Sequence, residues 1–337
     1  MENAKKWLPM AGVIVAVFLS YLTPAVAADW RQEYKEINMG VITEENAEDR
    51  AKRWDPVRDY LSKELGVPVK WREATDYAGV IEALKAKKVE LAWFGPASFA
   101  RAWIVTDGQA VPLAAEIDKD GGFGYFGVII VKKDSSYKTV EDLKGVRFGF
   151  ADPNSTSGYQ APNFFLTEQG YKPDEFFGST TFSGSHENSV KMLYEDNFDA
   201  VATWWTNDQK SNMSRMETKG MIEPGGYRII WKSPRLPSDP FTVPGWLPKQ
   251  MQDDIKTVLL AMPEKDPAAF KALMGGSQGF RAVTLEDYQP VIRFVKANLE
   301  KRKPVSYTHL RAHETGVEIA YAVLCWNSGG GGGGGGG

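Results

Sequence analysis

The chain has 337 residues, of which 40 are Lys or Arg and 43 are Asp or Glu, so its formal net charge at pH 7 is −3. The charges of both signs are interspersed, and this balance lacks the basic excess of a nucleic-acid-binding surface. The sequence holds only three histidines and one cysteine, which leaves little material for metal or thiol chemistry.

Residues 1–27 have the pattern of a secretion signal. A pair of lysines precedes an apolar run from Trp7 to Leu22, and Ala25-Val26-Ala27 matches a cleavage site. A membrane anchor is the alternative, but the run is short for a bilayer span and ends in the cleavage signal. No cysteine follows the run, so we expect no lipid anchor. The mature chain is expected to begin near Ala28 and to be soluble outside the inner membrane.

Residues 304–337 are expected to be foreign to the protein and disordered. The stretch from Val305 to Thr315 back-translates, codon by codon, into a transposase-type sequencing adapter, and Gly329 to Gly337 is what a run of no-signal G reads encodes. A flexible glycine linker or tag is the alternative. Without this tail the chain has one histidine, His186, and no cysteine, so we expect no disulfide, no thiol nucleophile, no metal site and no cofactor.

Strand and helix patterns alternate between these ends. Strands are predicted at 37–41, 67–71, 89–94, 125–131, 146–150, 198–203 and 227–231. Helices are predicted at 54–65, 77–84, 159–169, 186–194, 206–219, 247–261, 266–274 and 285–299. Repeated β-α-β units of this size predict an α/β fold whose sheets are mostly parallel with helices on both faces.

The pattern restarts after the first three strands, which predicts two lobes. We expect lobe 1 to comprise residues 28–131 plus 232–303 and lobe 2 to comprise residues 132–231. Extended crossings near Val128–Lys132 and Ile229–Lys232 would join them as a two-strand hinge. A ligand would then lie in the cleft between the lobes, at the carboxyl ends of strands.

The most informative motif is the polar turn Asp152-Pro153-Asn154-Ser155-Thr156-Ser157-Gly158. It follows the strand pattern 146–150 and precedes the helix pattern 159–169. This arrangement aims free backbone N–H groups at a ligand, and three consecutive hydroxyls add further donors. The motif predicts a site for a small tetrahedral oxyanion, although a plain helix cap and turn is the common use of such residues.

Five segments together resemble the periplasmic phosphonate-binding proteins of ABC transporters, within the class of two-lobed solute-binding proteins. The similarity extends over most of Ile37 to Ile292, with the segments in order and compatibly spaced. The segments are Asp76-Tyr77-Ala78-Gly79, Leu91-Ala92-Trp93-Phe94-Gly95, Asp152 to Gly158, Gly184-Ser185-His186-Glu187-Asn188, and Lys232 to Pro240.

The resemblance implies a type II-like periplasmic-binding-protein fold and a set of ligand-binding residues. Ser155, Thr156 and Ser157 match the residues that hold the phosphonate oxygens, and His186 matches a further donor. Tyr77 and Phe94 match residues of the opposite lobe, Asp239 matches a carboxylate that faces the ligand, and Asn207 falls where a glutamate meets the ammonium of 2-aminoethylphosphonate. Each has a structural alternative: a helix cap for His186, the core for Tyr77 and Phe94, and a turn for Asp239.

Two departures from the family pattern bear on the ligand. Phe94 stands where a tyrosine is usual, so a hydroxyl is missing, and Asn207 replaces the glutamate, which weakens capture of an ammonium. We therefore expect a broader or different preference, for alkyl- or aminophosphonates in general or for phosphite, rather than tight selection of 2-aminoethylphosphonate. Hydroxyls and N–H groups match the acceptor oxygens of a phosphonate, and we expect this site to work without a buried Lys or Arg.

The resemblance implies a periplasmic solute-binding component that closes on a phosphonate and docks on a membrane permease. We expect this component to be a monomer. An exported phosphate-ester hydrolase is an alternative, but a single histidine, no cysteine and no metal signature argue against an enzyme. A ligand-sensing domain that docks on a receptor stays open, because the same closed form could serve either partner.

Overall fold

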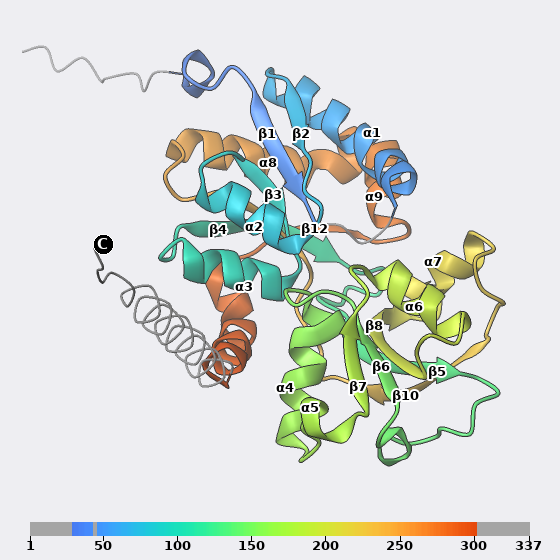
Figure 1. The fold of residues 1–337 in the computed structure, drawn as a ribbon. Helices are drawn as coiled ribbons and strands as arrows, with labels where there is room; N and C mark the ends of the chain where they lie inside the picture. The colour runs from blue at the N-terminus through green and yellow to red at the C-terminus, as the bar shows by residue number, and fades with distance from the viewer. Residues whose placement is uncertain (1–28, 43–45, 302–337) are drawn as a thin grey trace, which may run out of the picture.

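The computed structural model describes residues 29–42 and 46–301, in which the chain forms two β-sheets with helices packed around each (Figure 1). The expected signal at 1–27 and the expected foreign tail at 304–337 lie outside the described residues. Within the described residues, no helix combines the length and the apolar character needed to cross a membrane.

The first sheet has six strands in the order β12-β4-β11-β3-β1-β2. Its strands are β1 (Ile37–Val41), β2 (Val69–Arg72), β3 (Leu91–Trp93), β4 (Ala110–Ile117), β11 (Pro240–Pro244) and β12 (Gly279–Ala282). The helices that accompany it are α1 (Ala47–Leu65), α2 (Tyr77–Lys85), α3 (Pro96–Val105), α8 (Lys249–Lys265) and α9 (Pro267–Met274). Helices α1, α8 and α9 contact one another, and α2 contacts α3.

The second sheet has the strand order β10-β5-β8-β6-β7, and β9 pairs with β8. Its strands are β5 (Phe126–Lys132), β6 (Arg147–Phe150), β7 (Ser179–Phe182), β8 (Ala200–Asn207), β9 (Lys210–Ser211) and β10 (Tyr227–Lys232). Its helices are α4 (Ala161–Glu168), α5 (Pro173–Phe176), α6 (His186–Tyr194) and α7 (Asn212–Thr218), and a π-helical turn η3 (Thr156–Gln160) leads into α4. Short 3-10 turns occur at η1 (Trp30–Gln32), η2 (Glu141–Leu143) and η4 (Leu285–Tyr288).

The two-sheet α/β fold is confirmed, but the sheets are mixed rather than mostly parallel. In the first sheet β1 runs parallel to β2 and β3, whereas β11 and β12 pair antiparallel with their neighbours. In the second sheet β6 runs parallel to β7 and β8, whereas β5 pairs antiparallel with β8 and β10. Helix α1 connects β1 to β2, and helices α4 and α5 connect β6 to β7, as expected for parallel pairs, which need a crossover connection.

The segments expected as crossings lie inside the second sheet. Val128–Lys132 belongs to β5 and Ile229–Lys232 belongs to β10, which pair with each other. The chain passes between the sheets at 118–125 and 233–239, where Tyr125 and Leu236 exchange backbone hydrogen bonds of 2.9 and 2.8 Å. The buried apolar run of β5 does not show where the chain passes between the sheets. A strand inside a sheet and a strand that connects two sheets have the same local pattern of apolar residues.

Polar caps explain where the helices begin. The side chains of Asn46, Asp76, Ser185, Ser211 and Asp266 each accept a hydrogen bond from a backbone N–H in the first turn of α1, α2, α6, α7 and α9. Such caps satisfy amides that have no acceptor inside the helix. The helix predicted over 206–219 is shorter, because residues 200–207 and 210–211 pair as β8 and β9 before Ser211 caps α7.

A further helix at residues 289–301 lies beside both sheets' helices (Figure 1). Its Val291, Ile292 and Phe294 are buried in a cluster that also contains Ala97 of α3 and Ala161 of α4. The Asn298 side-chain amide donates to the backbone oxygen of Gln160, at 3.0 Å. This helix therefore braces the start of α4, the element that carries the polar turn.

Candidate ligand-binding cleft

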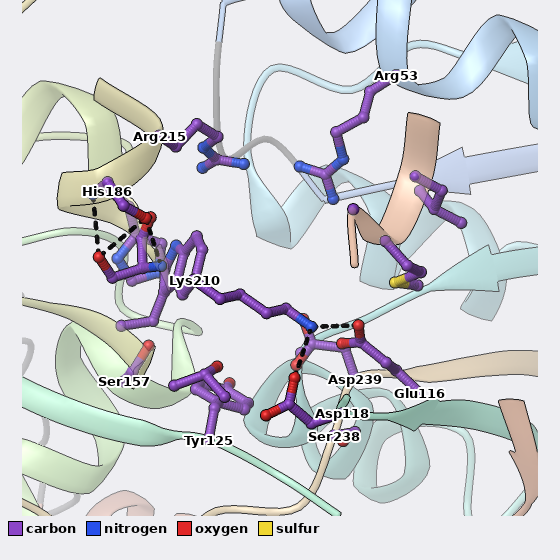
Figure 2. Close-up of a pocket in the computed structure, with 18 of the residues that line it drawn as sticks. Arg53, Glu116, Asp118, Tyr125, Ser157, His186, Lys210, Arg215, Ser238 and Asp239 are labelled. Carbon is purple, nitrogen blue, oxygen red and sulfur yellow. Dashed lines mark hydrogen bonds and ion pairs between the residues drawn. The ribbon is translucent and has the colours of Figure 1, made fainter. Parts of the chain in front are cut away.

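A cavity of about 320 Å³ lies between the two sheets and is lined by residues from both (Figure 2). The first sheet and its helices contribute Arg53, Tyr77, Trp93 and Glu116 among others. The second contributes the turn Ser155 to Ser157, His186, Trp204, Lys210 and Arg215. The crossing segments contribute Asp118, Gly124, Tyr125, Ser238 and Asp239. Its volume suits a small polar molecule.

The polar turn forms the helix N-terminus that its sequence predicted. Ser155 is the cap, and its Oγ accepts a hydrogen bond from the backbone N–H of Gly158 at 3.1 Å. The first-turn amides of Thr156 and Ser157 precede any intrahelical acceptor, so they are available to an anion. Gly158 is required here, because a Cβ would stand 2.5 Å from the Cβ of Ala151 and 2.9 Å from Cε1 of His186.

His186 begins α6 and is held by hydroxyls on both ring nitrogens. Its Nε2 lies 3.0 Å from the Oγ of Ser155, and its Nδ1 lies 3.2 Å from the Oγ1 of Thr203. The side chain is 2 % exposed. Asn212 donates its side-chain amide to the backbone oxygen of His186 at 2.9 Å. These contacts fix the ring beside the polar turn, where it can share in hydrogen bonding to an oxyanion.

Hydrogen bonds and an ion pair join the two sheets' elements across the cleft. The backbone N–H of Ala97, at the start of α3, donates to the Oγ1 of Thr156 at 2.8 Å, and both groups are buried. The ammonium of Lys219, which follows α7, lies 2.6 Å from Asp49 of α1. These contacts describe a closed arrangement, in which the N-terminus of α3 faces the polar turn.

Asp152 makes a similar contact and carries a shifted pKa. It is buried at the start of the polar turn, and its carboxylate accepts hydrogen bonds from the backbone N–H groups of Asn154 and Tyr77. Burial raises the pKa of Asp152 above its ordinary value of 3.8, and Asp76 raises it further, although the two backbone hydrogen bonds oppose the shift. The folded protein therefore holds the proton of Asp152 more tightly than the unfolded chain does.

The raised pKa of Asp152 predicts a pH-dependent effect of Asp152→Asn. In the wild type, the stability due to this group is fully present below the unfolded pKa and is lost as the pH rises through the folded pKa. The neutral amide lacks this loss, so Asp152→Asn should gain stability relative to wild type on going from about pH 4 to pH 7. Urea unfolding at the two pH values measures this difference, and a relative stability that falls over the same interval would contradict the argument.

Six of the eight predicted site residues line the cavity: Tyr77, Ser155, Thr156, Ser157, His186 and Asp239. Their contact with a ligand stays a prediction. The cap interpretation of Ser155 also holds, since the same hydroxyl caps the helix and faces the cavity.

Phe94 and Asn207 do not line the cavity. Phe94 is fully buried in the hydrophobic core of the first sheet, and its backbone N–H donates to Pro240 at 3.2 Å. Asn207 ends β8, where its Oδ1 accepts a hydrogen bond from the backbone N–H of Gln209 at 3.1 Å and so shapes the turn to β9. A tyrosine hydroxyl is nevertheless present in the cavity wall, because Tyr125 enters it from a crossing segment.

The cavity wall also holds three cationic side chains that the sequence analysis did not assign to the site, each of them partly exposed rather than buried. Arg53 of α1 stands 5.5 Å from the ring of Trp93, and Arg215 of α7 stands 5.3 Å from the ring of Trp204. Figure 2 shows the two guanidinium groups turned toward each other from opposite sides of the cavity. Lys210 of β9 is the third. Sequence offered little signal, since a basic residue on a helix or in a turn is ordinarily solvated.

Known proteins resemble this chain over most of the residues that the structure describes. The family described as "ABC transporter, phosphonate, periplasmic substrate-binding protein" matches residues 39–288. The phosphonates-binding periplasmic protein of Escherichia coli is 32% identical over 242 residues, which cover 71% of this chain and 68% of that protein. A probable ABC transporter phosphite-binding protein, PhnD1 of Prochlorococcus marinus, is 30% identical over 64% of this chain and 72% of its own length.

Solved structures share the fold. The structure of PhnD1 from Prochlorococcus marinus in complex with methylphosphonate has a TM-score of 0.68 and 25% identity, and covers 79% of this chain and 99% of its own. A binding-protein component of an ABC phosphonate transporter from Pseudomonas aeruginosa has a TM-score of 0.69 and 24% identity, and covers 87% of this chain and 99% of its own. The chain therefore belongs to the family of periplasmic substrate-binding proteins of phosphonate ABC transporters.

Proposed function

We propose that this protein binds a small phosphorus oxyanion, an alkylphosphonate or phosphite, in the cleft and delivers it to a membrane permease. One observation carries the proposal: the first-turn amides and hydroxyls of Ser155 to Ser157, with His186 beside them, line a cavity between two lobes. A tetrahedral oxyanion presents several acceptors to such donors. Each charge-assisted hydrogen bond contributes about 1.5–3 kcal/mol, which corresponds to roughly a tenfold to hundredfold change in affinity.

The names of the relatives support this class of ligand. They describe binding of phosphonates in Escherichia coli, phosphate import in Mycolicibacterium smegmatis and phosphite binding in Prochlorococcus marinus. All three ligand types share a tetrahedral phosphorus with anionic oxygens. The donors at the polar turn are suited to that shared group, and the rest of the cavity sets the choice among its members.

We further propose how the protein works in transport. Export through residues 1–27 would place the protein in the periplasm, where it would act as a monomer. The two sheets would mark two lobes that close on the ligand about the segments 118–125 and 233–239. Closure would bring Ala97 to Thr156 and Lys219 to Asp49, as in the arrangement described above. The permease would then recognise the closed form.

A hydrolase acting on phosphate esters is the second candidate, and one observation favours it. Ser155 Oγ lies 3.0 Å from His186 Nε2, as a nucleophile lies beside its base. The third group is a hydroxyl, Thr203, rather than a carboxylate, and Ser155 Oγ also accepts the N–H of Gly158. Among the described residues, no three His, Cys, Asp or Glu side chains are grouped to hold a metal. We therefore favour binding over turnover.

Calorimetry on the mature chain tests the proposal. Methylphosphonate and phosphite are expected to release heat and to raise the melting temperature, because a ligand that binds only the folded state stabilises it. Sulfate and a simple carboxylate are the comparison solutes. A phosphate monoester incubated with the protein should show no turnover above background. Absence of any response to phosphorus oxyanions, together with binding of an unrelated solute, would overturn the proposed function.

A further inference from the structure

Lys210 crosses the cleft and inserts its ammonium among acidic side chains of the opposite sheet. It lies in β9 of the second sheet, and its Nζ forms an ion pair with Glu116 of β4 in the first. The same Nζ lies 2.7 Å from the Oγ of Ser277 and 3.7 Å from the Oδ1 of Asp118. The side chains of Lys210, Glu116 and Asp118 are 26%, 18% and 12% exposed, so this contact is partly shielded from solvent.

These residues form one end of the ligand cavity. Lys210, Glu116 and Asp118 all line it, and Figure 2 shows the lysine side chain extended along the cavity toward Glu116 and Asp118. Figure 2 also shows His186 and Ser157 on the other side. The cavity thus has oxyanion donors at one side and carboxylate acceptors at the other.

An aminophosphonate would need both of these sides. Its phosphonate would meet the polar turn, and its ammonium would require the carboxylates of Glu116 and Asp118. That place is already taken by the ammonium of Lys210. A ligand ammonium would have to displace the lysine or lie beside a like charge, and both are unfavourable in a partly buried site.

The position of Lys210 is set by its strand. β9 pairs antiparallel with β8, with Asn207 opposite Lys210 and Trp205 opposite Ser211. Asn207 stabilises the intervening turn through the backbone of Gln209. Lys210 therefore reaches Glu116 from a backbone held on its own sheet, and the contact forms only when the two sheets are close together.

We propose that Lys210 determines the ligand class by acting as a built-in ammonium: it fills the acidic side of the cleft, so the closed protein accepts phosphonates with an uncharged substituent and rejects those with an ammonium. This inference rests on the proposed phosphonate-binding function. It assigns the exclusion to a lysine from the turn after β8, rather than to the absence of a carboxylate at Asn207.

The test compares two ligands on three proteins by calorimetry. Wild type should bind methylphosphonate at least about tenfold more tightly than 2-aminoethylphosphonate, since one charge-assisted hydrogen bond is worth about that factor. Lys210→Met keeps the length of the side chain and removes its charge, and it should shift the affinity ratio about tenfold to hundredfold toward 2-aminoethylphosphonate. Lys210→Arg keeps a cation and should keep the wild-type preference.

The ratio separates this role from a simple latch between lobes. Loss of an ion pair that only holds the lobes together would weaken the binding of both ligands equally. An unchanged ratio of the two affinities in Lys210→Met would therefore overturn the inference. Lys172→Met is the matched control, because Lys172 pairs with Glu175 on the exposed surface and should change neither affinity. The double variant Lys210→Met with Glu116→Gln should lose the gained affinity for the aminophosphonate; retention of that gain would also count against the proposal.

Two further results keep the test interpretable. If Lys210→Met lacks the cooperative thermal transition of wild type, Lys210→Gln replaces it, because the glutamine amide can still donate to Glu116 and Ser277. The same shift in the ratio of the two ligand affinities is then required. If wild type binds neither ligand while an unrelated solute binds, the proposed function itself has failed. Tight methylphosphonate binding with an unchanged ratio means that only the role of Lys210 is wrong.

Discussion

Replacing Ser155 with alanine is expected to weaken methylphosphonate binding about tenfold to hundredfold. The hydroxyl has three roles: it accepts the backbone N–H of Gly158, it contacts Nε2 of His186, and it faces the cavity. Its loss removes a donor that we propose for the ligand, and it releases the histidine ring from one of its two hydroxyl contacts. Calorimetric titration of the variant with methylphosphonate measures the effect.

The controls for Ser155→Ala separate binding from helix stability. Loss of a cap alone costs about 1 kcal/mol of stability. Asp266→Ala removes a cap at α9, where the carboxylate accepts the N–H of Ala269 at 3.0 Å, and it should lower stability with no change in affinity. Ser155→Ala and His186→Ala should combine less than additively, because the two side chains contact each other. Strictly additive losses, or an unchanged affinity in Ser155→Ala, would contradict a shared role.

Replacing Gly124 with alanine is expected to have the largest effect on stability. Gly124 has φ +111°, and a Cβ there would lie 1.9 Å from the carbonyl oxygen of Leu236 on the other crossing segment. Both the backbone conformation and the close approach require glycine. A strained backbone and a forced displacement together cost about 2–6 kcal/mol, and urea unfolding measures the loss. Ligand affinity should fall too, since the altered segment carries Tyr125 into the cavity wall.

Gly170→Ala is the matched control for Gly124→Ala. Gly170 also has a positive φ, +93°, but a Cβ there would have no neighbour within 4 Å. This variant therefore carries the backbone strain without the clash, and its free energy of unfolding should fall by about 1–3 kcal/mol. Equal losses for the two variants would show that the contact with Leu236 contributes nothing.

Much of the fold could be predicted from local sequence patterns. Alternating strand and helix patterns predicted the α/β class, and polar caps such as Asp76 and Ser185 mark helix starts that depend only on nearby backbone amides. Strands β4, β7, β9, β11 and β12 were missed. β11 begins and ends with proline, and all four residues of β7 are exposed, so neither shows a half-buried alternating pattern.

The crossing segments could not be located in this way. Their pairing joins Tyr125 to Leu236, two residues whose neighbours in sequence do not indicate that they meet. Phe94 was placed in the site for a related reason: its segment does reach the cleft through Trp93 and Gly95, but its own side chain faces the core. Phe94 directly follows β3, so the alternation of a strand does not indicate which way its side chain points.

Local sequence is enough to specify the polar turn that lines one side of the cleft. Ser155, Thr156, Ser157 and the following helix are neighbours in the chain, and a cap with its first-turn amides forms from local geometry alone. The opposite side of the cleft forms only through the packing of the two sheets. Lys210 and Glu116 are 94 residues apart, and Arg53 and Arg215 come from different lobes. Charges so distant in sequence meet only when the sheets pack together, and no local pattern specifies which of many surface charges will do so.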